Sequence, residues 1–84
     1  MKPIRMSDHA RRRCAFRGTT PGEVVEAVRR GAREGAKKGR LLCRLNFPYN
    51  RNWRGRRYRV KQVAPVIVES MREIVVITVY TFFF

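Results

Sequence analysis

The most constraining feature of the sequence is its last eleven residues, 74–84, which form the longest apolar stretch of the chain. A membrane-spanning helix needs about 20 apolar residues, so this stretch is roughly half as long as required. Its β-branched and aromatic side chains are typical of a β-strand, which we expect over residues 73–83. The sequence therefore indicates a protein that contains a sheet and has no membrane anchor.

The chain length limits the number of hydrophobic cores. A chain of 84 residues buries only about 60% of the surface that it exposes when unfolded, which leaves room for one small core. We therefore expect residues 1–84 to form a single domain, with no room for a second catalytic or cofactor domain. The first five residues are followed by further charge rather than by an apolar segment and a cleavage site, so we expect no secretory signal and a cytoplasmic protein.

Positive charge dominates the composition, with 20 Lys and Arg against 6 Asp and Glu and a formal net charge of +14. A small domain this basic attracts polyanions, of which nucleic acid is the leading class. Residues 1–18 carry +5 and residues 32–62 carry +10, whereas 19–31 are neutral and 63–84 carry −1. We expect the two basic segments to bind a partner and the other two to pack.

The two cysteines, Cys14 and Cys43, are expected to be small buried hydrophobic residues without a disulfide bond. Together with His9 they are the only candidates for a zinc site, which needs four ligands at closer spacing. The sequence therefore predicts no metal site.

A first helix is expected over residues 8–17, because Ser7 is a suitable N-cap and Gly18 a suitable residue after the C-terminal end. Helical spacing gives this segment one stripe with Met6, Ala10, Cys14 and the stem of Arg17. A neighbouring face carries four larger side chains: His9, Arg12, Arg13 and Phe16.

A second helix is expected over residues 21–30. Thr20 and Glu23 form a capping box, and Gly31 ends the segment. The inward face is expected to hold Val24, Val25 and Val28. The glycines within residues 31–39 indicate a mobile basic loop.

Three strands are expected after the helices, over residues 40–47, 56–69 and 73–83, with an exposed hairpin connection over 49–55. Pro65 marks a bulge, a bend or an edge position. In the last strand, alternation places Ile74, Val76, Thr78, Tyr80 and Phe82 on one face. The order of elements predicts an α+β fold in which two N-terminal helices pack on an antiparallel sheet of three to four strands.

His9, Arg12 and Arg13 form the first candidate site. Metal-independent RNA cleavage requires a group that removes a proton from the 2′-hydroxyl, a group that protonates the leaving 5′-oxygen, and fixed cations that stabilise charge on phosphorus. An imidazole beside guanidinium groups provides such parts. A surface histidine next to arginine that has no catalytic role gives the same pattern.

The second candidate site is a basic and aromatic segment, composed of Arg51, Trp53, Arg54, Arg56, Arg57, Tyr58 and Arg59. Cations follow a phosphate backbone and aromatic rings stack on unpaired bases, so this composition is expected of a surface that binds single-stranded nucleic acid. Alternatively, the two aromatic rings cover the core and the arginines keep the hairpin soluble.

Polar residues in the C-terminal strands form a third group. Thr78 and Tyr80 interrupt the apolar last strand, and Lys61 lies in the strand predicted to pair with it. A phenol that projects from a sheet can reach a phosphate, and we count Lys61 among the nucleic-acid-binding residues. A half-buried packing tyrosine and a solvated lysine are the alternatives.

Several motifs are shared with a known family. They are Ser7-Asp8-His9-Ala10 with an arginine three or four residues after the histidine, Arg17-Gly18-Thr19-Thr20 before Glu23-Val24, Tyr58-Arg59-Val60, and Ile77-Thr78-Val79-Tyr80. With these motifs the chain resembles, over nearly its whole length, a family of small toxin-like domains related to BrnT and to the RelE-type ribonucleases. The segment 33–57 departs from the family pattern because it is longer and richer in arginine.

The resemblance implies the barnase/EndoU/colicin/RelE type of fold. It also implies a type II toxin that cuts RNA through a 2′,3′-cyclic phosphate without a metal or cofactor. The implied partners are RNA and an antitoxin protein, which we expect to be acidic. We also count the ribosome and a homodimer formed through the last strand among the expected partners. By position, the implied active-site residues are His9, Arg12 or Arg13, Thr78 and Tyr80.

Two other functions fit the same sequence. A non-catalytic module that binds single-stranded RNA or DNA would use the same basic surface without needing His9. A structural partner of an acidic protein would use residues 82–84 and the edge of the sheet as its interface.

Overall fold

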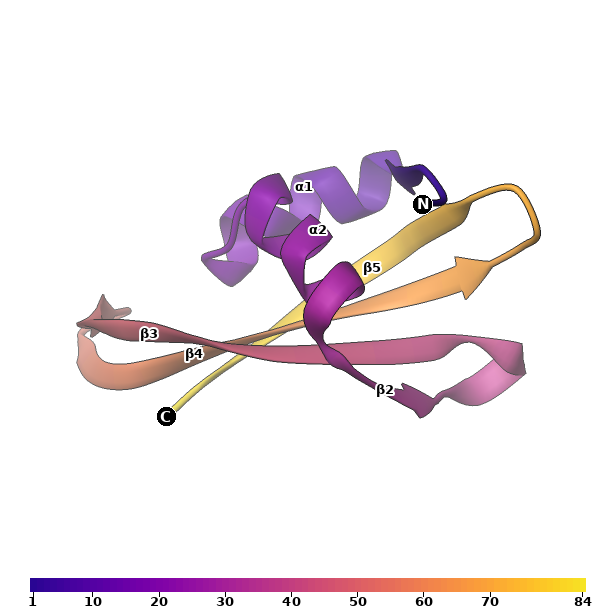
Figure 1. The fold of residues 1–84 in the computed structure, drawn as a ribbon. Helices are drawn as coiled ribbons and strands as arrows, with labels where there is room; N and C mark the ends of the chain where they lie inside the picture. The colour runs from indigo at the N-terminus through magenta and orange to yellow at the C-terminus, as the bar shows by residue number, and fades with distance from the viewer.

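A computed structural model describes all 84 residues and shows two layers, a five-stranded sheet and two helices that cover one of its faces (Figure 1). The elements are β1 (Ile4–Met6), α1 (Asp8–Arg17), α2 (Pro21–Arg30), β2 (Ala32–Gly35), the 3-10 turn η1 (Lys37–Gly39), β3 (Leu41–Trp53), β4 (Arg56–Glu69) and β5 (Ile74–Phe83). The expected α+β class is confirmed. Both helices have the expected bounds, and none is long and apolar enough to cross a membrane.

Local capping explains both helices. The Ser7 hydroxyl accepts a hydrogen bond from the Ala10 amide at 3.0 Å, and the Thr20 hydroxyl accepts one from the Glu23 amide at 3.2 Å. Gly18 ends α1 with a φ of 71°, a left-handed conformation that glycine adopts at little cost. The helix ends are thus determined by residues next to them in the chain.

The sheet has the strand order β1-β5-β4-β3-β2 and is mixed, because β1 runs parallel to β5 while the other pairs are antiparallel. The prediction of an antiparallel sheet of three to four strands was therefore wrong, because it lacked the two edge strands, β1 and β2, and the parallel pairing of β1. The two missed strands have only three and four residues, which is too short to show an alternating pattern.

Two segments predicted as loops are ordered as strands or turns. The expected connection over residues 49–55 belongs to β3 as far as Trp53, and a two-residue turn at Arg54 and Gly55 joins β3 to β4. Both turn residues have positive φ, at 50° and 83°. The expected loop over residues 31–39 instead contains β2 and η1.

The core lies between the helices and the covered face of the sheet. Its fully buried members include Ala10 from α1, Val24, Ala27 and Val28 from α2, Cys43 from β3, Val63 and Ile67 from β4, and Val76 and Val79 from β5. The inward positions of α2 are Val24, Ala27 and Val28, while Val25 is only partly buried. Both cysteines are buried and free, as expected.

The alternation predicted for the last strand is interrupted. β5 pairs with β4 with a register shift between Val66 and Ile67, since Val66 pairs with Thr78 but Ile67 pairs with Val76. Ile77 is therefore an extra residue, a β-bulge that exchanges the two faces of the strand. As a result Ile74 and Val76 lie in the core, whereas Thr78 and Tyr80 line a pocket outside it.

Candidate nucleic-acid site

The candidate site lies where the N-terminal part of the chain contacts the last strand, β5. β1 pairs with the start of β5, and Ser7 follows at once, donating its hydroxyl proton to the Ile77 carbonyl at 3.3 Å. This places the first turn of α1 beside the bulge, where His9 Nε2 lies 3.2 Å from Thr78 Oγ1. The structure thus brings together two of the predicted active-site residues that are 69 positions apart.

Tyr80 follows Thr78 on β5 and keeps 43% of its surface exposed. The Arg17 guanidinium lies over its ring, 5.5 Å from the ring centroid. The Thr81 hydroxyl donates to the Arg17 carbonyl at 2.6 Å, which fixes the end of α1 against β5. His9 and Arg17 therefore mark the two ends of α1 along the same strand.

Arg17 is a functional candidate that the sequence analysis did not select. Its Nε atom is buried and has no hydrogen-bond partner. The signal in the sequence is its spacing of eight residues from His9, which returns to the same side of a helix. Arg12 and Arg13, by contrast, are exposed on α1 and form no hydrogen bond or ion pair.

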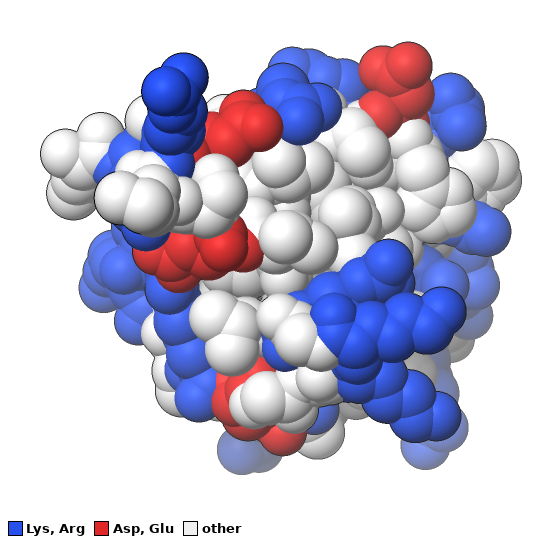
Figure 2. Space-filling view, turned by 90° about the vertical axis from the view of Figure 1, so that its right-hand side faces the viewer, with Lys and Arg blue, Asp and Glu red and all other residues white.

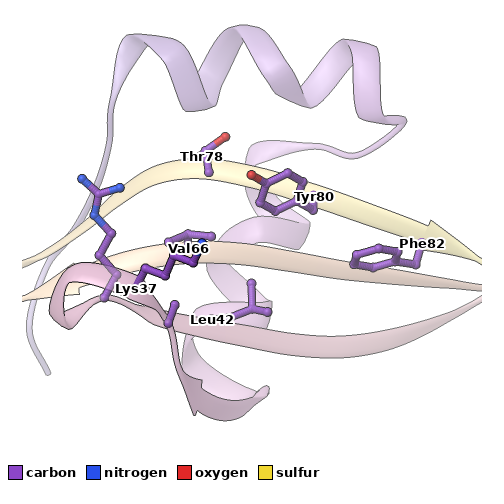
Figure 3. A pocket seen from close by; sticks show the side chains of 8 residues that line it. Lys37, Leu42, Val66, Thr78, Tyr80 and Phe82 are labelled. Atoms are coloured by element: carbon purple, nitrogen blue, oxygen red, sulfur yellow. The ribbon is translucent and has the colours of Figure 1, made fainter.

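A pocket of about 530 Å³ lies on the sheet face that the helices leave uncovered (Figure 3). Thr78 and Tyr80 border it on one side, Lys37 and Leu42 on the other, and Phe82 at one end. Ala36, Arg40 and Val66 complete its lining. Thr78 lines the pocket and also contacts His9, so it connects the predicted acid/base residue to the pocket. Its basic residues, Lys37 and Arg40, were not selected from the sequence because they were assigned to a loop.

The aromatic rings of the β3–β4 hairpin pack inward. The Trp53 ring stacks on Phe83 with centroids 5.1 Å apart, and Tyr58 lies 5.5 Å from the same ring. Both rings are partly buried, and their contacts with Phe83 favour a packing role, which the sequence left open as the alternative to base stacking.

The arginine side chains of the hairpin differ in their contacts with the rest of the protein. Arg54 donates to the Phe16 carbonyl at 2.8 Å, and Arg51 lies over the Tyr49 ring at 5.0 Å. The other three, Arg56, Arg57 and Arg59, are exposed, and their side chains form no hydrogen bond or ion pair. These three remain the free cations of the predicted binding segment.

Lys61, which the sequence placed among the nucleic-acid-binding residues, is buried between the sheet and the helices. Its side chain is only 5% exposed, and its Nζ atom lies 2.7 Å from Glu23 Oε1 and 2.9 Å from the Gly18 carbonyl. The alternation of β4 turns this side chain toward the helices, so its charge pairs inside the protein.

Most of the negative charge is already paired with neighbouring cations. Five of the six acidic side chains form ion pairs: Glu23, Glu26, Glu34, Glu69 and Glu73. Hydrogen bonds from Lys2 and then Arg33 lower the pKa of Glu69, and one from Arg5 lowers the pKa of Glu73. Figure 2 shows the acidic side chains on one face lying against basic ones, with further clusters of Lys and Arg beside them. The remaining positive charge is therefore available for an anionic partner.

The two thiols are poor nucleophiles. Burial raises the pKa of Cys14 and of Cys43 above the ordinary value, which favours the neutral thiol.

No family model, curated protein or solved structure matches this chain.

Proposed function

We propose that this chain is a toxin-like endoribonuclease domain of the RelE/barnase type that cuts single-stranded RNA by transesterification. The observation that carries the proposal is the contact between His9 Nε2 and Thr78 Oγ1, at 3.2 Å, beside a pocket with basic and aromatic walls. The contact supports the proposal because an imidazole can act as a general acid or base and because the pocket beside it has basic and aromatic lining residues.

The proposed reaction needs one base, one acid and fixed positive charge. His9 removes the proton from the 2′-hydroxyl, and the 2′-oxygen attacks phosphorus. The bond from phosphorus to the 5′-oxygen breaks, and the Tyr80 phenol gives its proton to the leaving oxygen. The products are a 2′,3′-cyclic phosphate and a 5′-hydroxyl, and proton exchange with water restores both side chains.

The other residues of the site position these groups. The Thr78 hydroxyl orients the imidazole of His9, and Arg17 holds the ring of Tyr80. Arg12 and Arg13 are exposed, unpaired cations on the same helix, as is Arg11, and either Arg12 or Arg13 stabilises the negative charge that develops on phosphorus. An acidic antitoxin protein is the partner that fits the uncompensated charge of the whole domain.

The test is cleavage of an end-labelled single-stranded RNA in the presence of EDTA. We compare the wild type with His9→Ala and with Arg72→Ala, an exposed arginine outside the site. Loss of a general base typically slows a reaction by about 10² to 10⁴-fold. Cleavage by the wild type and by Arg72→Ala, with cyclic-phosphate ends, together with loss of cleavage in His9→Ala, is the expected result. Equal cleavage by all three proteins would contradict the proposed role of His9.

A non-catalytic module for single-stranded nucleic acid is the second candidate, favoured by the three free arginines of the hairpin. It predicts tight, salt-sensitive binding that is unchanged in His9→Ala, and no cleavage by any variant. The same RNA, measured for both binding and cleavage, separates the two candidates.

A further inference from the structure

The pocket on the uncovered face of the sheet combines an apolar floor with two cations that have no partner. Leu42 and Val66 contribute apolar lining, and Lys37 and Arg40 add positive charge. Neither cation forms an ion pair, while five of the six carboxylates are paired elsewhere. The pocket therefore suits a ligand that has both a flat apolar part and a negative charge.

The backbone that carries the two cations forms a tight turn. The Ala36 amide donates to the Arg40 carbonyl at 2.8 Å, and the Arg40 amide donates to the Lys37 carbonyl at 3.3 Å. Lys38 and Gly39 between them have φ values of 62° and 70°, so the chain reverses here within few residues. Because the turn is closed on itself, the backbone positions of Lys37 and Arg40 are fixed relative to the strands.

The aromatic part of the pocket is held as firmly. The Arg44 guanidinium lies over Phe82, 5.4 Å from the ring centroid. Arg44 is itself fixed by hydrogen bonds to Glu34 at 2.6 Å and to Gln62 at 2.8 Å. Phe82 is 41% exposed and Tyr80 is 43% exposed, so both rings present surface to solvent.

We propose that this pocket binds one unpaired base of a single-stranded RNA, with the adjoining phosphate on Lys37 and Arg40. This inference rests on the proposed function, since it places that nucleotide beside the phosphate that His9 faces. A volume of about 530 Å³ falls within the range of about 300 to 1,000 Å³ that is usual for ligand pockets. In a duplex the base faces are already stacked, so only an unpaired strand can offer one to Phe82 and Tyr80.

The test uses a short 2′-O-methyl RNA strand, which lacks the 2′-hydroxyl and is not cleaved. Fluorescence anisotropy gives its Kd for the wild type, for the double variant Lys37→Gln/Arg40→Gln, and for the control Lys38→Gln/Arg72→Gln. Both double variants lose the same charge, but Lys38 and Arg72 do not line the pocket. We expect binding about tenfold weaker for the pocket variant and at most about threefold weaker for the control, at one fixed salt concentration.

The contribution of the base to binding is tested by changing the RNA strand and leaving the protein unchanged. An abasic strand of equal length has the same charge, and we expect the wild type to bind it roughly tenfold more weakly. Phe82→Leu should reduce this difference, and because the ligand-side comparison uses the unchanged protein, it holds even if that variant fails to fold. Equal affinity for the two strands would overturn the inference, as would equal weakening by the pocket and control variants. A poly-glutamate peptide that binds the wild type more tightly than the RNA would also overturn it, by assigning the pocket to an acidic protein.

The outcomes also separate this inference from the proposed function. If cleavage depends on His9 but the pocket variants bind RNA as tightly as the wild type, the ribonuclease proposal is supported and the base pocket is not. If the pocket variants bind RNA more weakly but the wild type does not cleave RNA that has its 2′-hydroxyl groups, the base pocket is supported and the ribonuclease proposal is not.

Discussion

A single buried cation, Lys61, connects both helices to the middle of the sheet. It extends from β4 to the carbonyl of Gly18 after α1 and to Glu23 in α2, and the Thr19 hydroxyl donates to the same carboxylate oxygen at 2.9 Å. An ammonium group removed from water is costly unless it is paired and hydrogen-bonded. Lys61 meets both conditions, so its charge serves the arrangement of the helices and not the binding of RNA.

Replacing Lys61 with methionine should therefore destabilise the fold and leave RNA affinity nearly unchanged. The substitution keeps an unbranched apolar side chain as far as Cε but removes the ammonium group, which leaves the Glu23 carboxylate and the Gly18 carbonyl without this donor. We expect a loss of about 1 to 3 kcal/mol, measured by urea unfolding. The control is Arg57→Ala on the exposed hairpin, where we expect a change of at most about 0.5 kcal/mol. Unchanged stability with weaker RNA binding would instead assign Lys61 to the surface.

At the scale of elements, the features that could be predicted from the sequence are those determined by residues close together in the chain. Ser7 and Thr20 cap helices through contacts three residues away, so both helices could be predicted with their bounds. β1 and β2 have three and four residues and form only by pairing with β5 and β3, which no local pattern reveals. The bulge at Ile77 likewise depends on pairing with β4.

The candidate site shows the same division. The resemblance to toxin-like domains predicted His9, Thr78 and Tyr80 as one site, and the first two are in contact. Lys37 and Arg40 could not be assigned to it, because their place beside Thr78 depends on the turn between β2 and β3 and on the register of three strands.

The two helix caps allow stability and function to be separated. Ser7→Ala and Thr20→Ala each remove one capping acceptor, and each should cost about 1 kcal/mol in urea unfolding. Ser7 also donates to the Ile77 carbonyl and precedes His9, whereas Thr20 caps the helix that does not reach Thr78. We expect RNA cleavage to fall in Ser7→Ala and to persist in Thr20→Ala under conditions where both are folded. Equal activities would show that this cap does not position His9.

At the scale of the whole molecule, acid should destabilise the fold through Glu69 and Glu73. Their pKa values are lower in the folded state, so the folded protein binds fewer protons than the unfolded chain. The stabilising contribution is complete above the unfolded pKa of about 4.3 and is lost as the pH falls through the folded pKa. We expect the urea midpoint to be constant near neutral pH and to fall in acid. The double variant Glu69→Gln/Glu73→Gln should show a smaller fall, and an unchanged acid profile would contradict this account.

RNA binding should depend on particular unpaired arginines and not only on the net charge of the protein. Arg56 and Arg57 have no acidic partner, whereas Arg5 is paired with Glu73 and Arg30 with Glu26. Each phosphate contact with a single strand contributes about 0.7 to the slope of log Kd against log salt concentration. The double variant Arg56→Gln/Arg57→Gln should therefore lower the slope for a single-stranded RNA by about 1.4. Arg5→Gln/Arg30→Gln removes the same charge and should leave the slope nearly unchanged, because these side chains already contact carboxylates. If both variants reduce the slope equally, binding depends on net charge alone, and the hairpin is not the surface that holds the strand.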